Sequence, residues 1–396
     1  MTGPAQDPRA LRDPYAAYAA QAAMRSRCPV QSVSDGPAGR ATYVVTGYAE
    51  AREALVDPRL SKDTGAFFAG RESRRRLHPA VSRSMLASDP PRHTRLRRLV
   101  TKAFTTGAVK ELRPFIARVT DELLDQWPVG EPLDFVARLA VPLPVIVICR
   151  LLGVPEADRA AVRRWSAELF SAGEPDAIDT ASHALAAYMA DLVSAGRRDP
   201  GGSLLDRLVS ARDGEDRLSE EELVSLAVLL LVAGHETTTN ALGNALLALL
   251  RHPPVLDRLR QDPDGIPAAL DELLRFDPAV STATFRFTTE VVTLGGTEIP
   301  AGVPVLVALG AANRDPDRFP APDDLDPDRD AAAHLAFGHG IHRCVGAPLA
   351  RAEMEIALRA VLTRFPGIRL AVPPDRLEWR RTRLVRGLAS LPVLTR

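Results

Sequence analysis

The sequence predicts a mainly α-helical protein with small β-sheets, and three observations support this fold class. Helical patterns dominate the 396 residues, and the longest runs from Ser219 to about Arg251. Strand-like segments are few and short, and no internal repeat or interdomain linker divides the chain. Hydrophobic residues make up 46% of it, enough to bury a large core. We therefore expect one domain over residues 13–396, preceded by an N-terminal extension at residues 1–12.

The long helix has clear ends and a mostly apolar body. Ser219 and Glu222 form the pattern of a capping box, and His252 with the two prolines after it stops the helix. Residues 223–232 include almost no polar side chain, so this half of the helix has no polar face. A helix of this kind is buried on all sides, and we expect it to be central in the fold.

Strand signals are confined to short segments that are rich in β-branched residues. The expected strands are residues 41–46, 291–294, 297–299 and 303–309, with a last short hairpin at residues 384–394. Gly295 and Gly296 supply the turn of the hairpin between the second and third of these segments. The Pro- and Asp-rich segment 315–330 is expected to be a long ordered loop.

Composition excludes several classes of protein. Fifty basic and fifty acidic residues give a formal net charge of zero, so no global field favours nucleic acid or a membrane surface. Three scattered cysteines, Cys28, Cys149 and Cys344, cannot form a disulfide framework. The N-terminus lacks the pattern of a secretory signal, and the longest apolar run, residues 223–234, is too short to span a bilayer. We expect a cytoplasmic monomer that binds neither nucleic acid nor membrane.

The clearest chemical signal is the ten-residue segment FGHGIHRCVG at positions 337–346. It places Cys344 in a loop whose three glycines lack side-chain bulk, seven residues after Phe337 and directly before a helical pattern. Thiolate is a strong donor to iron, and an axial cysteine on haem iron favours cleavage of an O–O bond. The glycines also let backbone N–H groups point at the sulfur, which tunes its charge. The segment therefore predicts a thiolate metal ligand.

Three other interpretations explain this loop less well. A buried structural cysteine needs neither flanking glycines nor a spaced aromatic ring. A zinc site of His339, His342 and Cys344 lacks the fourth ligand that closed zinc sites normally have. A dinucleotide-binding loop fails because Arg343 stands where the pattern GxGxxG requires its third glycine.

A second signal lies inside the long helix, where positions 233–240 read AGHETTTN. Helix propensity disfavours Gly234 and a run of threonines, so another requirement selects them. A loosened polar turn can offer the Thr237 hydroxyl and the Glu236 carboxylate to a ligand, and such a pair can deliver the protons that reductive oxygen activation consumes. The alternative is that Thr237 bonds to its own helix and Glu236 faces solvent. A zincin motif is rejected because Thr239 replaces its second histidine.

Together the two segments resemble the cytochrome P-450 family. The loop matches that family's cysteine-ligand pattern FGxGxHxCxG at every defined position, and the helix matches its oxygen-activation pattern AGx[DE]TT. The resemblance implies a single cytochrome P-450 fold, with the long central helix over a haem b. It further implies that Cys344 is the iron ligand with Phe337 packed nearby, that Ala233 and Gly234 contact the haem, and that Glu236 and Thr237 act as catalytic residues.

The same resemblance assigns cationic and structural positions. Buried propionates need fixed cationic donors, and the implied propionate-binding residues are His93, Arg97, Arg286 and His342. The alternative, for each of these residues considered alone, is an ordinary charged residue on the surface. Glu272 and Arg275, joined by Arg329, would form a structural network that holds the cysteine loop from behind.

The activity that the resemblance implies is that of a haem-dependent monooxygenase. Such an enzyme inserts one atom of O₂ into a C–H or C=C bond, here of a bulky, mainly apolar natural product such as a macrolide, another polyketide or a steroid. Electrons would come from an acidic ferredoxin and its NAD(P)H-dependent reductase, with docking on a basic face that includes Arg343. The expected substrate contacts are Phe67, Phe68, Met85, Leu86, Phe170, Leu229, Val280, Thr284 and Leu384.

Two alternatives to this activity stay open on the sequence alone. One is a peroxide-using peroxygenase of the same fold, a branch that dispenses with the acid and alcohol present here at Glu236 and Thr237. The other is a non-catalytic haem-binding protein that recruits a partner.

Overall fold

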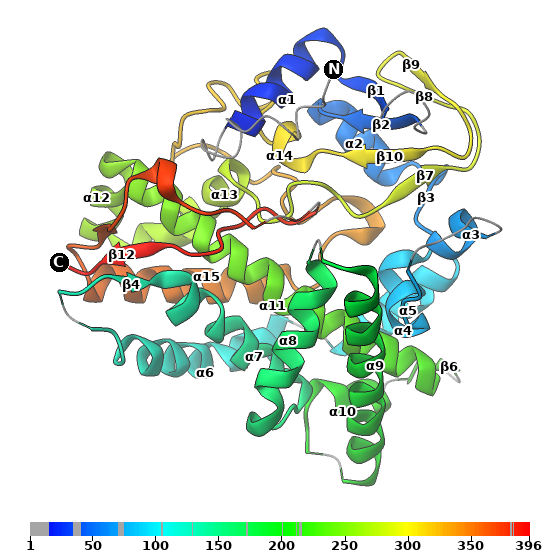
Figure 1. The fold of residues 1–396 in the computed structure, drawn as a ribbon, viewed down its shortest axis with the longest axis horizontal. Coiled ribbons are helices and arrows are strands. Elements are labelled where there is room, and N and C mark those ends of the chain that lie inside the picture. The colour runs from blue at the N-terminus through cyan, green and yellow to red at the C-terminus, as the bar shows by residue number, and fades with distance from the viewer. Residues whose placement is uncertain are drawn as a thin grey trace.

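The computed structural model describes residues 16–34, 41–69, 75–103, 106–128, 130–171, 173–199, 201–210, 212–213, 216–380, 382 and 384–396. It confirms a mainly α-helical fold with small β-sheets. Figure 1 shows most strands gathered at one end of the molecule and helices filling the other. The N-terminal extension predicted at residues 1–12 lies outside the described residues.

Fifteen α-helices are present in the described part of the chain. Their bounds are α1 Ala16–Arg27, α2 Tyr48–Val56, α3 Thr64–Phe68, α4 Pro79–Ser82, α5 Arg92–Ala103, α6 Thr106–Leu124, α7 Pro142–Leu152, α8 Arg159–Phe170, α9 Pro175–Arg198, α10 Leu204–Ser210, α11 Glu220–Arg251, α12 Pro253–Gln261, α13 Ile266–Phe276, α14 Leu309–Ala312 and α15 Ala347–Arg364.

Helix α11 is the predicted long helix, and it runs through the middle of the fold (Figure 1). Ser219 caps it, and the reciprocal bonds between Ser219 and Glu222 form the predicted capping box. The helix packs against α7, α9 and α15, which explains its apolar surface. Among the described residues it is the one helix with the length and hydropathy of a membrane span, but 67% of that stretch is buried inside the protein, as in a core helix.

The largest sheet has five strands in the order β1, β2, β10, β7, β3. Their bounds are β1 Val30–Ser34, β2 Ala41–Val45, β10 Pro304–Val307, β7 Arg286–Thr288 and β3 Leu60–Ser61. Strands β2 and β10 pair in parallel and the other neighbours pair antiparallel. This sheet carries Arg286 and the end of β3 to the edge of the central cavity described below.

The other sheets are smaller. The hairpin of β8 Val292–Leu294 and β9 Thr297–Ile299 confirms the sequence prediction, with Gly295 at φ 53° and Gly296 at φ 75° in its turn. A second pair is β5 Arg212–Asp213 with β6 Asp216–Arg217. The third sheet has the order β11 Arg369–Leu370, β12 Pro392–Leu394, β4 Leu133–Asp134.

The hairpin predicted at residues 384–394 is wrong. Residues 392–394 pair with two distant segments, β4 and β11, rather than with their neighbours in sequence. Val385 instead forms an isolated bridge with Val280, and Leu388 forms one with Trp379. The alternation of apolar residues was recognisable locally, but the pairing partners are set by the tertiary fold.

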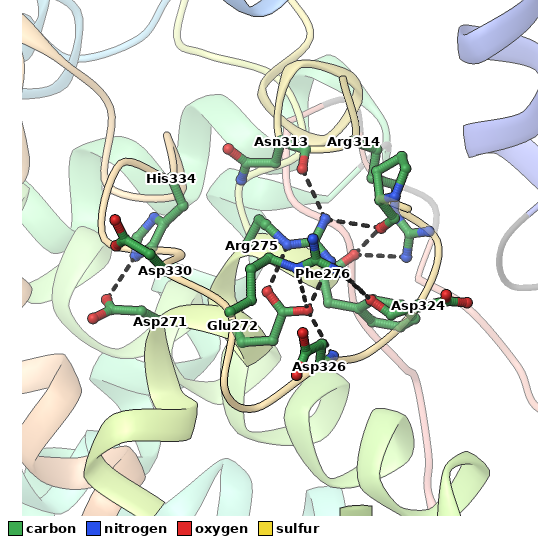
Figure 2. Close-up of polar contacts among 12 residues, drawn as sticks. Asp271, Glu272, Arg275, Phe276, Asn313, Arg314, Asp324, Asp326, Asp330 and His334 are labelled. Carbon is green, nitrogen blue, oxygen red and sulfur yellow. Dashed lines mark hydrogen bonds and ion pairs between the residues drawn. The ribbon is translucent and has the colours of Figure 1, made fainter. Parts of the chain in front are cut away.

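A buried ion pair on α13 bonds to the long loop after α14 and so connects the helix to that loop (Figure 2). Arg275 donates two hydrogen bonds to Glu272, at 2.6 and 2.8 Å, and both side chains are 0–1% exposed. Arg329 donates a third bond to the Glu272 carboxylate over 3.2 Å. This arrangement confirms that the three side chains meet, as the sequence predicted, and excludes the alternative of an ordinary surface pair.

The same network reaches the segment that leads into the cysteine loop. Arg275 donates to the carbonyl oxygen of Asn313, and the side-chain oxygen of Asn313 accepts the backbone N–H of Leu335 at 2.6 Å. Leu335 lies two residues before Phe337. The position of the loop is therefore fixed by a chain of buried hydrogen bonds that begins at the Glu272–Arg275 pair.

Candidate active site

A cavity of about 280 Å³ lies between α11 and the loop that carries Cys344. On one side it is bounded by residues of α11 that include Ala233, Gly234 and Thr237. On the other side it is bounded by Phe337, Cys344 and the start of α15. The two motifs that were separate in the sequence thus face one another across a single space.

The glycines of the cysteine loop have identifiable roles. Gly338 and Gly340 adopt φ values of 71° and 72°, a region that favours glycine. A side chain at Gly340 would also meet Val56, because an added Cβ would lie 2.8 Å from its Cγ1. The backbone N–H of Cys344 donates to the carbonyl oxygen of Phe337 at 2.9 Å, which closes the loop. Substitution by a larger residue would therefore displace the cysteine.

The sulfur of Cys344 faces the cavity, which is why the residue counts as exposed although protein surrounds it. Burial raises the pKa of the thiol, and this effect is opposed by the backbone N–H groups of Gly346 and Ala347 and by the charges of Arg97 and Arg343. Backbone N–H groups thus favour the thiolate form of Cys344, as the glycines of the loop predicted. The thiolate that a metal would bind is therefore already provided with hydrogen-bond donors.

Helix α11 remains continuous through the predicted polar turn. Gly234 is explained by packing against α7, because an added Cβ would lie 2.9 Å from Cδ1 of Ile148. Thr237 lines the cavity, and its hydroxyl donates to the carbonyl oxygen of Ala233 at 2.7 Å. The alternative that Thr237 bonds to its own helix is thus correct, although the residue also borders the cavity.

Glu236 is buried and does not face solvent, contrary to the second half of that alternative. Its carboxylate accepts a 2.7 Å hydrogen bond from Arg380 and lies 3.6 Å from Nε2 of His235. Burial alone would raise the pKa of Glu236, but His235 and Arg380 outweigh it and lower the pKa to about 2. Glu236 is therefore ionised at neutral pH, and the stability this arrangement provides is lost only as the pH falls from an ordinary glutamate pKa toward that value.

One end of the cavity collects the basic residues predicted to bind propionates, namely His93, Arg97, Arg286 and His342. The rings of His93 and His342 lie 4.1 Å apart between centroids. Burial, followed by the charges of Lys62, His93, Arg286 and Arg97, lowers the pKa of His342 to about 2. Burial likewise lowers the pKa of Arg286 to about 10. A negative charge bound at this end would be stabilised, because it would offset the repulsion among these basic groups.

Most of the predicted substrate contacts also reach the cavity. Its lining includes Met85, Leu86, Phe170, Leu229, Val280, Thr284 and Leu384. Phe67 and Phe68 do not belong to this lining. Phe67 is buried in an aromatic cluster with Phe285 and Phe287, at centroid distances of 4.8 and 4.9 Å, and Phe68 is 46% exposed. The structure thus places these two rings beside the cavity lining, packed against Phe285 and Phe287, and their contact with substrate stays a prediction.

Sequence reasoning missed three residues at this site. Lys62 and Glu353 line the cavity and are almost fully buried, and Arg380 binds Glu236. No local pattern marks Lys62 or Arg380, because each reaches the site from a segment distant in sequence. Glu353 lies two turns into α15, where one acid among apolar residues could have been noticed.

Comparisons with known proteins agree with this geometry. The family model described as cytochrome P450 matches residues 176–381. Cytochrome P450 107B1 of Saccharopolyspora erythraea is 46% identical over 90% of this chain and 89% of its own length. The chain belongs to the cytochrome P450 family.

Further similarities extend over nearly the whole P450. Mycinamicin IV hydroxylase/epoxidase of Micromonospora griseorubida is 44% identical over 90% of both chains. The solved structure of the tirandamycin C-bound P450 monooxygenase TamI is 46% identical and superposes with a TM-score of 0.89, covering 98% of this chain and 99% of that one. This P450 is accordingly a monooxygenase with haem as its cofactor.

The residues present in the cavity fit a haem. Its iron requires an axial donor, and a thiol faces the space from one side. Its two propionates require cations, and the cationic end contains buried Arg286 and His93, whose Nδ1 has no hydrogen-bond partner among the described residues. Two further ionisable side chains line the space, those of Lys62 and Glu353. Burial raises the pKa of Glu353 well above its ordinary value, which favours the uncharged acid.

We predict that Cys344 is the iron ligand. The reduced protein with carbon monoxide should show the strongly red-shifted Soret band of a thiolate ligand, and Cys344→His should lose that band. Cys149→Ser, at a buried cysteine of α7 outside the cavity lining, is the matched control and should keep it. Persistence of the red-shifted band in Cys344→His would assign the ligand to another residue.

Proposed function

We propose that this P450 inserts one atom of O₂ into a C–H or C=C bond of a bulky, mainly apolar natural product of the macrolide, polyketide or steroid type. The observation that carries the proposal is the lining of the cavity on the α11 side. Met85, Leu86, Phe170, Leu229 and Val280 present apolar surface there. Such a lining binds by buried area, with selectivity from few polar contacts.

The names of two relatives support the same class of substrate. One is called a hydroxylase/epoxidase of mycinamicin IV, and the TamI structure holds tirandamycin C. A bound haem would supply the redox chemistry of iron with O₂, and the Cys344 thiolate would hold its iron. The residues of this chain then have three tasks: to hold the haem, to orient the substrate, and to move protons.

Proton movement is assigned to Thr237 with Glu236 behind it. Thr237 and Thr238 are the two threonines of α11 in the cavity lining, and the Thr237 hydroxyl donates to the carbonyl oxygen of Ala233. Glu236 is outside the cavity lining, so a proton must pass between the two side chains through water. Arg380 binds Glu236 and is 26% exposed, which places solvent on the far side of the carboxylate. The pair Glu236 and Thr237 can therefore conduct protons without opening the cavity.

The proposed electron donor is an acidic ferredoxin, served by a reductase that uses NAD(P)H. Arg343 and Arg52 are exposed beside the cysteine loop, together with the exposed apolar side chains of Val56 and Ile341. An apolar centre with basic neighbours suits a small acidic protein, because charge steers the encounter and apolar contact holds the complex. Gly340 touches Val56, so this surface is directly behind the proposed ligand loop.

A substrate-induced spin-shift screen tests the substrate class. Macrolides, polyene lactones and steroids should shift the Soret band with dissociation constants of about 10 μM or lower, because the lining offers a large apolar contact. Product analysis with the best ligand should show the addition of one oxygen atom. Tight binding confined to small polar aromatic compounds would contradict the proposed class while leaving the family assignment intact.

Thr237→Ala should uncouple electron use from product formation. The variant should bind substrate and consume NAD(P)H at near the original rate, but product per NAD(P)H should fall about tenfold or more as peroxide is released. Thr239→Ala, at a buried threonine of the same helix outside the cavity lining, is the matched control. Unchanged coupling in Thr237→Ala would remove the hydroxyl from the proposed proton path.

Arg343→Glu should slow reduction by the ferredoxin about tenfold at low salt, and the original protein should show a marked ionic-strength dependence. Arg163→Glu, on the exposed face of α8, provides the same change of charge on another helix and should have little effect. The midpoint potential of each variant separates docking from any change at the iron. Rates insensitive both to salt and to the Arg343 reversal would contradict this docking face.

A further inference from the structure

The cationic end of the cavity contains a fifth basic residue, Lys62. Lys62 directly follows β3 and is 3% exposed, and its side chain lines the cavity beside His93, Arg286 and His342. Lysine is almost never fully buried unless it has a partner of opposite charge. We therefore looked for a partner of opposite charge among the groups around Lys62.

The hydrogen bonds of Lys62 do not include a carboxylate. Its ammonium group donates to the hydroxyl of Thr284. The nearby acid is Asp89, but that carboxylate accepts the backbone N–H of Lys62 at 3.1 Å and the hydroxyl of Ser61, not the ammonium group. Within the described residues, no carboxylate oxygen lies within 4.0 Å of the Lys62 nitrogen. Burial, and then the charge of Arg286, lower the pKa of Lys62 well below its usual range, against the opposing effect of Asp89.

Arg286 shares this situation. It is also 3% exposed, and the hydrogen bond seen for its guanidinium runs to the carbonyl oxygen of Thr284 at 3.3 Å. Two buried cations thus converge on Thr284, one at its hydroxyl and one at its carbonyl. Leaving a buried cation without an anion is strongly unfavourable, so this arrangement calls for a negatively charged occupant between the two side chains.

We propose that Lys62 is an anion-binding residue of the cavity and that its ligand is a haem propionate, held by the ammonium group together with the Thr284 hydroxyl. The inference rests on the proposed propionate role of His93, Arg97, Arg286 and His342, and adds a donor from the segment directly after β3. Haem supplies two negative charges, and a set with two buried cations accommodates both of them. Thr284 is then a positioning residue for Lys62 in addition to a boundary of the substrate space.

The same chemistry could be supplied by the carboxylate of an acidic substrate. The geometry favours the propionate, because Lys62 lines the same end of the cavity as His93 of α5 and His342, which precedes Cys344 by two residues. A substrate that placed a carboxylate there would have to share the cations that hold the haem. The two sources predict different results and can be separated in one set of variants.

The test compares Lys62→Met, which removes the charge at similar length, with Lys62→Arg, which keeps it. Transfer of ferric haem from the holoprotein to excess apomyoglobin should be about tenfold or more faster for Lys62→Met and near the original rate for Lys62→Arg. The midpoint potential of Lys62→Met should become more negative, because a cation near the haem stabilises the reduced state. Thr284→Val, which removes the hydroxyl, should show a smaller acceleration in the same direction. Lys110→Met, on the exposed face of α6, is the matched control and should change neither quantity.

Binding of a long-chain fatty acid and of its methyl ester completes the test. Under the proposal, the ratio of their affinities is the same in the original protein and in Lys62→Met. Loss of a preference for the acid in Lys62→Met, with unchanged haem transfer and potential, would assign Lys62 to substrate and overturn the proposal. Unchanged haem transfer, potential and affinity ratio would also overturn it. If Lys62→Met retains the red-shifted band with carbon monoxide, Cys344 still binds the iron. Either outcome against the Lys62 proposal would then leave the proposed function unaffected.

Discussion

The position of the cysteine loop depends on the hydrogen bonds that the buried carboxylate of Glu272 accepts. This carboxylate accepts from Arg275, from Arg329 and from the backbone N–H of Asp326, so one acid joins α13 to the long loop that follows α14 (Figure 2). Arg275 in turn holds backbone carbonyls of that loop. Because charges without access to water require complete pairing, loss of any one partner would release the others. The loop of residues 313–329 therefore behaves as a rigid support although it contains no helix or strand.

That support matters because the cavity has two faces that come from distant parts of the chain. Helix α11 presents leucines, small residues and two threonines, whereas the opposite face presents a thiol whose pKa is lowered by backbone N–H groups against the effect of burial. Charge is distributed with the same asymmetry. Cations gather at one end of the space, while the anionic Glu236 is kept outside the lining by Arg380. A planar dianionic ligand has one favourable orientation in such a field, with its acidic edge at the cationic end.

The sequence was sufficient wherever one continuous segment defines a feature. The Cys344 loop, the Ser219 cap and the Gly295-Gly296 turn are each encoded within about ten residues, and their conformations follow from glycine and capping preferences. Lys62 and Arg380 could not be found in this way, because each gains its role from a partner more than 140 residues away. The packing of Phe67 could not be found for a related reason: its partner Phe287 lies on β7, Phe285 directly precedes that strand, and no local pattern predicts either contact. The C-terminal strand pairing belongs to the same category of long-range choices.

The hydrogen bond from Thr237 to the carbonyl oxygen of Ala233 gives the hydroxyl a direction. A hydroxyl has a single hydrogen, and here the helix backbone holds it, so the face turned to the cavity consists of lone pairs. In this resting arrangement the residue can only receive a hydrogen bond from the cavity. It becomes a donor after rotation about its C–O bond, which gives up the contact with its own helix. The Thr237 hydroxyl thus has two orientations. Whether it donates to the cavity or accepts from it depends on competition between the α11 backbone and the ligand in the cavity.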